Sequence, residues 1–459
     1  MFFLIRVCLV ATLGGLLLGY DTAVISGTVN YLQTHFDLSE MMLGWVVSSA
    51  IVGCIIGAAV AGSISDAFGR KAAFFVAAAA FLISAVGTAL PQTVGQLVFF
   101  RLIGGIGVGM ACIISPMYIA EIAPQRLRGR LVSLNQIAIL TGMVIVYIVN
   151  AQIAGTNTPE WNAEYGWRWM FGSGALPAAI FVLLIFTIPE SPRWLIKVGR
   201  DAEARKVLGG IFSQEESERM IREVQEGLTM EEGGWSEVFS KTYQPALRLG
   251  VLLAIIQHGT GINAVMYYAP RIFSHAGVEN SSAIGHMVII SLIMVGFTLV
   301  GLSLVDKLGR RPLLIFSTMG MSLSLFMLYF FYGNTGSGGF RESLVLFWII
   351  AYAASFSIGM GPIVWVIISE IFPNRVRGRC ASVAVFFMWT ASLAISQLFP
   401  WLLKVANEGV FLIFAVLSTL SLIYIWLAVP ETKGKSLEEI EQDWQTRASR
   451  KLALTSAAG

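Results

Sequence analysis

Two residues of opposite charge interrupt long apolar segments of this 459-residue chain. Asp21 follows a leucine-rich stretch, and Arg101 lies a few residues into another apolar run. An ionisable side chain surrounded by hydrocarbon is costly, so by default it indicates function. An arginine partner favours the charged carboxylate, whereas a dry site without that partner favours the protonated one. Asp21 and Arg101 are therefore candidates for a pair that takes up and releases a proton.

Their depths in a membrane predict that the two side chains can meet. A rise of 1.5 Å per residue puts Asp21 roughly 25 Å above the start of its helix and Arg101 roughly 6 Å below the opposite surface. In a hydrocarbon core about 30 Å thick these heights are similar. The alternative is a permanent ion pair that only neutralises itself and orders the helices.

A polar cluster lies within a further apolar stretch, where Gln257, His258 and Asn263 accompany two glycines. Such a sequence predicts a broken helix, whose freed backbone is tolerated only where it lines a cavity. Gly359 to Pro362 predict a second break. Amides and aromatic faces together suit a ring that carries many hydroxyls. The candidate contact residues are Gln136, Gln257, His258, Asn263, Tyr267, Trp365 and Trp389, although any single tryptophan can equally be a packing or lipid-interface residue.

The composition indicates that membrane-spanning helices position these side chains. Hydrophobic residues make up 56% of the chain and charged residues 13%, with a mean hydropathy of +0.72. Apolar runs reach the length of about 20 residues that a membrane helix needs. We predict an all-α membrane protein with twelve spans near residues 4–29, 43–64, 72–90, 97–120, 131–154, 168–188, 246–273, 283–305, 312–332, 344–369, 380–403 and 409–429.

The distribution of Lys and Arg orients these spans. Short loops rich in arginine fall on one side, which the positive-inside rule makes cytoplasmic, and an even number of crossings places both termini there. The net charge of +3 and the absence of a basic run with interleaved aromatics argue against nucleic acid. The four cysteines lack metal spacing, and no cofactor, metal or catalytic motif is visible. We expect no enzyme, no metal and no cofactor.

The two halves of the sequence echo each other, about 240 to 250 residues apart. This repetition predicts two six-helix halves at 1–188 and 246–429, a helical cytoplasmic linker at 189–245 and a cytoplasmic tail at 430–459. Parallel repeats of this kind work by rocking around a site near the middle of the membrane. The repeated motifs are Asp66 to Arg70 and Asp306 to Arg310, Glu121 to Pro124 and Glu370 to Pro373, and Pro189-Glu190 and Pro430-Glu431.

Charged residues in these repeats are candidates for a cytoplasmic gating network. An acidic residue at a helix end that faces an arginine of the next loop can hold one access state and must break in the other. The alternative for any single motif is a solvated loop. The candidates are Asp66, Arg70, Glu121, Arg128, Glu190, Asp306, Arg310, Glu370, Arg377 and Glu431.

These motifs closely resemble those of the sugar porter family of the major facilitator superfamily, over nearly the whole chain. The resemblance implies that the partners are a monosaccharide and a proton. We expect the protein to be a monomer in the lipid bilayer of a cell membrane, such as a bacterial inner membrane. The resemblance also implies that Gln136, Gln257, Asn263 and Trp365 contact sugar. Passive members carry Asn where this chain has Asp21, so the acid favours proton-coupled symport.

Three departures from the family pattern leave the preferred sugar open. His258 stands where a second Gln is usual, Met294 where an Asn is usual, and Met388 where an amide is frequent. Lost amides remove hydrogen bonds to particular hydroxyls, and an apolar wall discriminates weakly. The alternatives to proton symport are an uncoupled sugar facilitator, a porter of another polyol such as inositol, and a sugar receptor that does not transport.

Overall fold

The computed structural model describes residues 2–229, 235–240, 243–333, 339–372 and 376–433, and their regular structure is helical. Twelve helical segments in this part of the chain are long and apolar enough to cross a membrane, which confirms the predicted spans. Most extend a few residues beyond the predicted ends. Four predicted parts lie outside the described residues: Pro373, 230–234 and 241–242 of the linker, and 434–459 of the tail.

The helices of the amino-terminal half and the linker follow the order of the sequence. The sixth span combines three helices and a π-helical turn at 162–166. The bounds are α1 Phe2–Phe36, α2 Glu40–Phe68, α3 Arg70–Ala89, α4 Val94–Ile122, α5 Gln125–Thr156, α6 Pro159–Trp161, α7 Trp167–Gly172, α8 Ala175–Ile185, α9 Pro192–Lys197, α10 Asp201–Gly209, α11 Gln214–Thr229 and α12 Trp235–Val238.

The remaining helices include two spans that are interrupted, as the glycines predicted. Two helices form the seventh span, and two helices with a π-helical turn at 356–360 form the tenth. The bounds are α13 Gln244–Gly259, α14 Ile262–His275, α15 Asn280–Leu308, α16 Arg310–Tyr332, α17 Gly339–Ser355, α18 Gly361–Ile371, α19 Arg377–Ala406 and α20 Gly409–Ala428.

The chain forms two compact units. The first contains residues 1–230 with 266–274 and 279–291, and the second contains 231–265, 275–278 and 292–459. Most of α14 and the start of α15 therefore group with the first unit. Within the units the repeat is visible in the packing: α1 with α5, α3 with α4 and α3 with α8 correspond to α13 with α19, α16 with α17 and α16 with α20.

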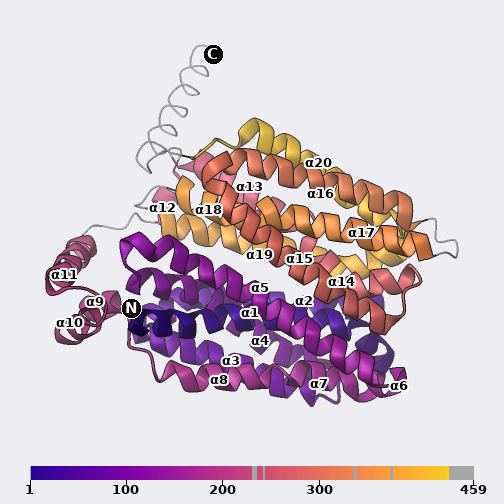
Figure 1. Ribbon diagram of the computed structural model, residues 1–459, viewed down its shortest axis with the longest axis horizontal. Helices are drawn as coiled ribbons and strands as arrows, with labels where there is room; N and C mark the ends of the chain where they lie inside the picture. Colours follow the sequence, from indigo (N-terminus) through magenta and orange to yellow (C-terminus); the bar gives the residue numbers. More distant parts are fainter. Residues whose placement is uncertain (1, 230–234, 241–242, 334–338, 373–375, 434–459) are drawn as a thin grey trace, which may run out of the picture. The chain divides into compact units, whose positions relative to one another are not determined.

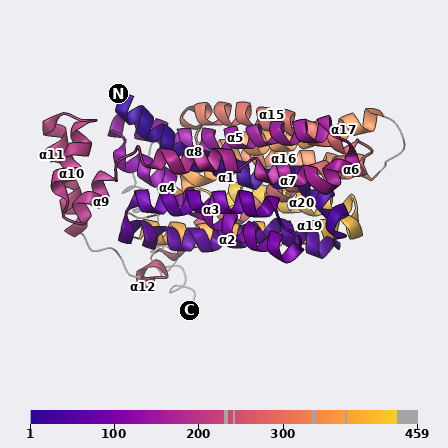
Figure 2. The ribbon, with the colours of Figure 1, turned by 90° about the horizontal axis from the view of Figure 1, so that it is seen from below.

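The linker helices α9, α10 and α11 form a small cluster with its own core. Trp194, Leu195, Leu208 and Ile221 are buried in it, so the amphipathic sequence of this region has a partner for its apolar face. Figures 1 and 2 show the three helices at the end of the first unit where the amino terminus lies, with α6 at the other end.

A capping box begins α11 in this cluster. The Glu216 carboxylate accepts from the backbone N–H of Ser213 at 3.2 Å, and the Ser213 hydroxyl accepts from the N–H of Glu216. These hydrogen bonds hold the pKa of Glu216 below its usual value. The linker is therefore locally specified by its own sequence.

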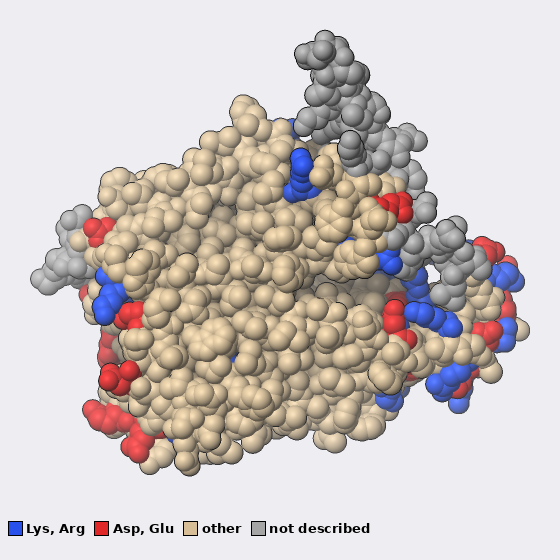
Figure 3. All heavy atoms as spheres, turned by 180° about the vertical axis from the view of Figure 1, so that it is seen from behind, with Lys and Arg blue, Asp and Glu red and all other residues tan. Residues whose placement is uncertain are grey.

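Charged side chains gather at the ends of the face drawn in Figure 3, and its broad middle carries almost none. Large apolar residues such as Leu183 on α8, Phe186 directly after it and Leu427 on α20 are exposed. In water such a surface would aggregate, whereas lipid solvates it. The exposed surface therefore agrees with a membrane-spanning protein.

Candidate functional site

Asp21 and Arg101 meet inside the first unit, as their estimated depths predicted. Nη1 of Arg101 lies 3.8 Å from Oδ2 of Asp21, and the side chains are 3% and 16% exposed. This separation is an ion pair but is too long for a hydrogen bond. Within the described chain, Oδ2 of Asp21 and Nε of Arg101 are buried without a hydrogen-bond partner.

Arg101 also has an apolar support. Its guanidinium lies over the ring of Phe171, 5.7 Å from the centroid. A cation over an aromatic face is stabilised by the ring quadrupole. Arg101 therefore keeps one favourable partner if Asp21 loses its charge.

Gln257 connects the two interrupted spans of the second unit. Its side-chain N–H₂ donates to the carbonyls of Met360 at 3.1 Å and Gly361 at 2.8 Å, where the π-helical turn meets α18. Gly261 has φ +92°, and a β-carbon there would clash with the Phe414 ring, so the break in the seventh span requires glycine. Gln257 is buried, and its Oε1 has no hydrogen-bond partner among the described residues.

Asn263, His258 and Trp389 form a second polar group in the same unit. Nδ2 of Asn263 lies 2.7 Å from Nδ1 of His258 and 2.9 Å from the hydroxyl of Ser392. As the amide is oriented, Nδ1 of His258 accepts and Nε2 carries the proton. The His258 and Trp389 rings lie 5.7 Å apart, and the buried indole N–H of Trp389 has no partner in the described chain.

The other predicted sugar contacts are less closely connected. Gln136 is half-buried on α5 and Tyr267 is buried on α14, both in the first unit. Trp365 is half-buried on α18 in the second unit. Their roles remain predictions from the sequence.

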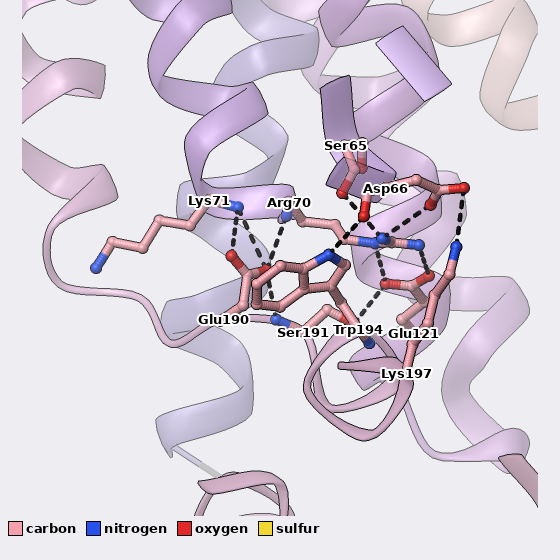
Figure 4. A network of polar contacts seen from close by, with 9 residues as sticks. All are labelled: Ser65, Asp66, Arg70, Lys71, Glu121, Glu190, Ser191, Trp194 and Lys197. Atoms are coloured by element: carbon pink, nitrogen blue, oxygen red, sulfur yellow. Dashed lines mark hydrogen bonds and ion pairs between the residues drawn. The ribbon is translucent and has the colours of Figure 1, made fainter. Parts of the chain in front are cut away.

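The first copy of the repeated charge motif is a dense network in the first unit (Figure 4). Nε and Nη2 of Arg70 donate to the two carboxylate oxygens of Glu121 at 2.9 and 2.8 Å. Glu121 also accepts from the Ser191 hydroxyl, and Asp66 pairs with Arg70 and with Lys197, each at 3.2 Å. Such a bidentate, buried pair is geometrically specific.

The second copy, in the second unit, is more open. Arg310 lies 3.1 Å from Asp306 and 3.1 Å from Glu370, with a single contact to each. The side chains of Arg310, Glu370 and Asp306 are 15%, 23% and 80% exposed. Glu370 also accepts from the hydroxyl of Thr432 at 2.6 Å. The two copies therefore share the Asp–Arg and Arg–Glu contacts, but the side chains of the second copy are more exposed.

Glu190 and Glu431 cap the helices that follow the two motifs. Glu190 accepts from the backbone N–H of Arg70 at 2.8 Å, and Glu431 accepts from that of Arg310 at 3.0 Å. A carboxylate at a helix N-terminus satisfies free N–H groups and complements the helix dipole.

The glycines of the two motifs make this capping possible. Gly69 and Gly309 have φ +95° and +98°, and a β-carbon at either position would collide with the capping carboxylate. Sequence reasoning placed both glutamates in a gating network; the structure gives them this capping geometry.

The network roles expected of Arg128 and Arg377 stay predictions. Arg128 is exposed on α5 and forms no hydrogen bond or ion pair with the described residues, so the structure does not bring it into the Arg70 network. Arg377 donates to the carbonyl of Phe372 at 3.1 Å. Both arginines lie near the start of a helix, which is why the sequence pattern suggested an ionic partner for each.

Several contributing residues were missed at the level of sequence. Lys197 and Trp194 reach the first network from the linker, where Trp194 donates to the carbonyl of Asp66 at 3.0 Å. Arg271 is buried and pairs with Glu40 at 2.8 Å in the first unit. An arginine near the end of an apolar span was the available signal for that pair, whereas the linker contacts had none.

No group of His, Cys, Asp and Glu in the described ranges could hold a metal ion. The polar groups brought together by the structure are the Asp21–Arg101 pair and the neutral groups around the helix breaks.

Comparisons with known proteins bear on the family of the chain. The family model described as "Sugar (and other) transporter" matches residues 7–444. The D-xylose-proton symporter of Escherichia coli (strain K12) is 39% identical, over 98% of this chain and 97% of the relative. The arabinose-proton symporter of Bacillus subtilis (strain 168) is 38% identical, over 96% and 95%.

Solved structures give the same result. An inward-open structure of the xylose transporter XylE from E. coli matches with a TM-score of 0.85 and 39% identity, over 96% of this chain and all of that one. A structure of XylE bound to 6-bromo-6-deoxy-D-glucose matches with a TM-score of 0.78, over 96% and 99%. At this identity the likeness extends beyond fold to the whole sequence.

Proposed function

The chain belongs to the sugar (and other) transporter family, a family of transporters and not of enzymes, and we propose that it carries a monosaccharide across a membrane together with a proton. The observation that supports coupling most directly is the buried Asp21–Arg101 pair, held at 3.8 Å without a hydrogen bond. Relatives named for proton symport of D-xylose and of arabinose support a pentose as the substrate, and a relative named as a glucose transport protein supports a hexose.

Protonation of Asp21 is the proposed coupling step. A proton gradient can drive sugar only if the proton affinity of some group differs between the access states. Arg101 supplies that difference if it faces Asp21 in one state and withdraws from it in another. Phe171 then holds the guanidinium when the carboxyl group is neutral.

The neutral groups of the second unit are the proposed sugar contacts. The amide N–H₂ groups of Gln257 and Asn263 are engaged within the protein, so each residue offers its carbonyl oxygen as an acceptor. His258 and Trp389 offer ring N–H groups as donors. This alternation suits sugar hydroxyls, which both donate and accept, and we propose that Gln136, Tyr267 and Trp365 add to it.

The Arg70 and Arg310 networks are the proposed cytoplasmic gate. In alternating access each half moves around the substrate, so polar contacts that favour one state must be broken in the other. Lys197 supports such a role because it brings the linker to Asp66. This assignment implies that both termini and the linker lie in the cytoplasm of a cell. We also propose that one chain is sufficient for transport.

Uptake into proteoliposomes tests the proposal. Purified protein is reconstituted, and uptake of labelled D-xylose, L-arabinose, D-glucose and inositol is measured with and without an imposed pH gradient. We expect at least one monosaccharide to accumulate above its external concentration only with the gradient. Equilibration without accumulation would identify a facilitator, preferred inositol uptake a polyol porter, and binding without uptake a receptor.

A further inference from the structure

A small cavity borders Asp21 inside the first unit. Its volume is about 20 Å³, above the roughly 10–15 Å³ that one water molecule requires. Residues of helices α1, α3 and α7 and of the α7–α8 corner line it, and none of the proposed sugar contacts is among them. The lining residues that matter here are Tyr20, Asp21, Ala85, Thr88, Phe171 and Gly174.

Polar groups at this cavity are suited to water. Asp21, whose side chain is 16% exposed, and Thr88 both line it, and the Thr88 hydroxyl oxygen retains acceptor capacity while it donates to the carbonyl of Ser84 at 2.7 Å. The Tyr20 hydroxyl lies 2.6 Å from that of Ser173. A buried water needs two to four such partners.

Asp21 has titratable neighbours on three other helices of the described chain. They include Arg101 on α4, Cys54 on α2 and Tyr267 on α14. Of these, the arginine alone is charged at neutral pH in the ordinary state of such groups. The Arg101 guanidinium therefore competes with a proton that arrives at Asp21. The ring of Phe171, in the cavity wall, contacts this guanidinium.

We propose that this cavity is the water site through which the proton reaches Asp21, separate from the residues that bind sugar. A hydrated proton in the cavity gives its proton to the Asp21 carboxylate, so an O–H bond forms there, one breaks in the hydronium ion and water remains. Nothing is oxidised or reduced. Thr88 and Tyr20 are positioning residues for that water. The inference rests on the proposed proton-coupled transport.

A glycine in the wall offers a way to fill the cavity. Gly174 has φ −64°, which alanine adopts readily. Its added methyl group would lie 3.3 Å from the carbonyl oxygen of Phe171 and 3.5 Å from both the Ala85 β-carbon and the Tyr20 ring. Gly172 is a matched control because its added methyl group would meet only Ala89, at 3.3 Å, and it does not line the cavity.

The test compares two assays on Gly174→Ala, Gly172→Ala and the parent protein in proteoliposomes, with whichever of D-xylose, L-arabinose and D-glucose the parent accumulates. We expect Gly174→Ala to slow gradient-driven uptake at least fivefold and to leave sugar counterflow at equal pH within twofold, because exchange needs no net proton movement. Gly172→Ala should match the parent in both assays.

A second variant keeps the test decisive if Gly174→Ala does not fold. Thr88→Val keeps the shape of the wall but removes its hydroxyl, and it should also slow gradient-driven uptake selectively. The inference is overturned if both variants leave uptake unchanged, or if they slow counterflow as much as uptake. A parent protein that never responds to the gradient would instead contradict the proposed function.

Discussion

Two buried arginines of the first unit, Arg70 and Arg101, hold their carboxylates in opposite ways. Arg70 donates two hydrogen bonds of 2.9 and 2.8 Å to Glu121, and both side chains are 7% exposed. Arg101 reaches Asp21 at only 3.8 Å, and polar atoms on both side chains lack hydrogen bonds. Burial is comparable, so the difference lies in the number of supporting partners.

This difference suggests different roles for the two pairs. The Arg70–Glu121 pair is suited to stabilising one conformation, and the Asp21–Arg101 pair is suited to a change of protonation. A carboxylate with several donors strongly resists protonation, because each donor favours the charged form. A carboxylate with one distant partner has little to lose when it takes up a proton. The loosely held pair is thus suited to coupling, and the networked pair is suited to holding a conformation.

The largest expected effect on stability comes from Arg70→Ala. It leaves the Glu121 carboxylate buried without its bidentate partner, which costs about 3–5 kcal/mol of unfolding free energy. Denaturant unfolding in detergent measures this. Arg219→Ala is the control, because Arg219 is an exposed linker residue that pairs with Glu223; it should leave the midpoint unchanged, and an equal loss in both variants would refute the assignment.

Double-mutant cycles sharpen the same comparison. Coupling energies of neighbouring residues span roughly 0.5–3 kcal/mol. We expect the Arg70–Glu121 coupling near the upper end and the Asp21–Arg101 coupling near the lower end. The reverse order would mean that distance and partner number do not distinguish the two pairs.

Arg310→Ala is expected to cost less, about 1–2 kcal/mol of unfolding free energy, because solvent screens the second network more than the first. Glu370 keeps the hydroxyl of Thr432 as a donor in this variant. The same unfolding experiment applies. A loss as large as that of Arg70→Ala would show that the exposed network is as important as the buried one.

The smallest effect concerns the neutral cluster of the second unit. Ser392→Ala removes one partner of Asn263 and should weaken sugar binding by about 0.5–1.5 kcal/mol, or roughly two- to tenfold. Titration calorimetry with the transported sugar measures this. Ser382→Ala on the same helix is the control, because that exposed hydroxyl donates only to the carbonyl of Gly378. Unchanged affinity in Ser392→Ala would remove Ser392 from the support of the site.

Features set by local sequence could be predicted well. Long apolar runs predicted the twelve spans, since few other structures tolerate them. Gly261 predicted the break in the seventh span, because glycine readily adopts a positive φ there. A rise of 1.5 Å per residue was sufficient to bring Asp21 and Arg101 to the same height.

Features set by tertiary packing could not be predicted. Ser392 is one of many serines in apolar helices, so nothing in the sequence singles it out as a partner of Asn263. Lys197 reaches Asp66 only because the linker folds back onto the first unit. Arg128 has the spacing of a network residue, yet its direction on α5 leaves it exposed.

The most direct measurement is made on Asp21→Asn. The substitution mimics the protonated carboxyl group permanently, so purified protein in liposomes should still exchange labelled sugar in counterflow. It should fail to accumulate that sugar on an imposed pH gradient. A purely structural Asp21–Arg101 pair predicts instead an unstable protein that does neither, because Arg101 would be buried without an anionic partner. Active accumulation that survives in Asp21→Asn would contradict the coupling role of this residue.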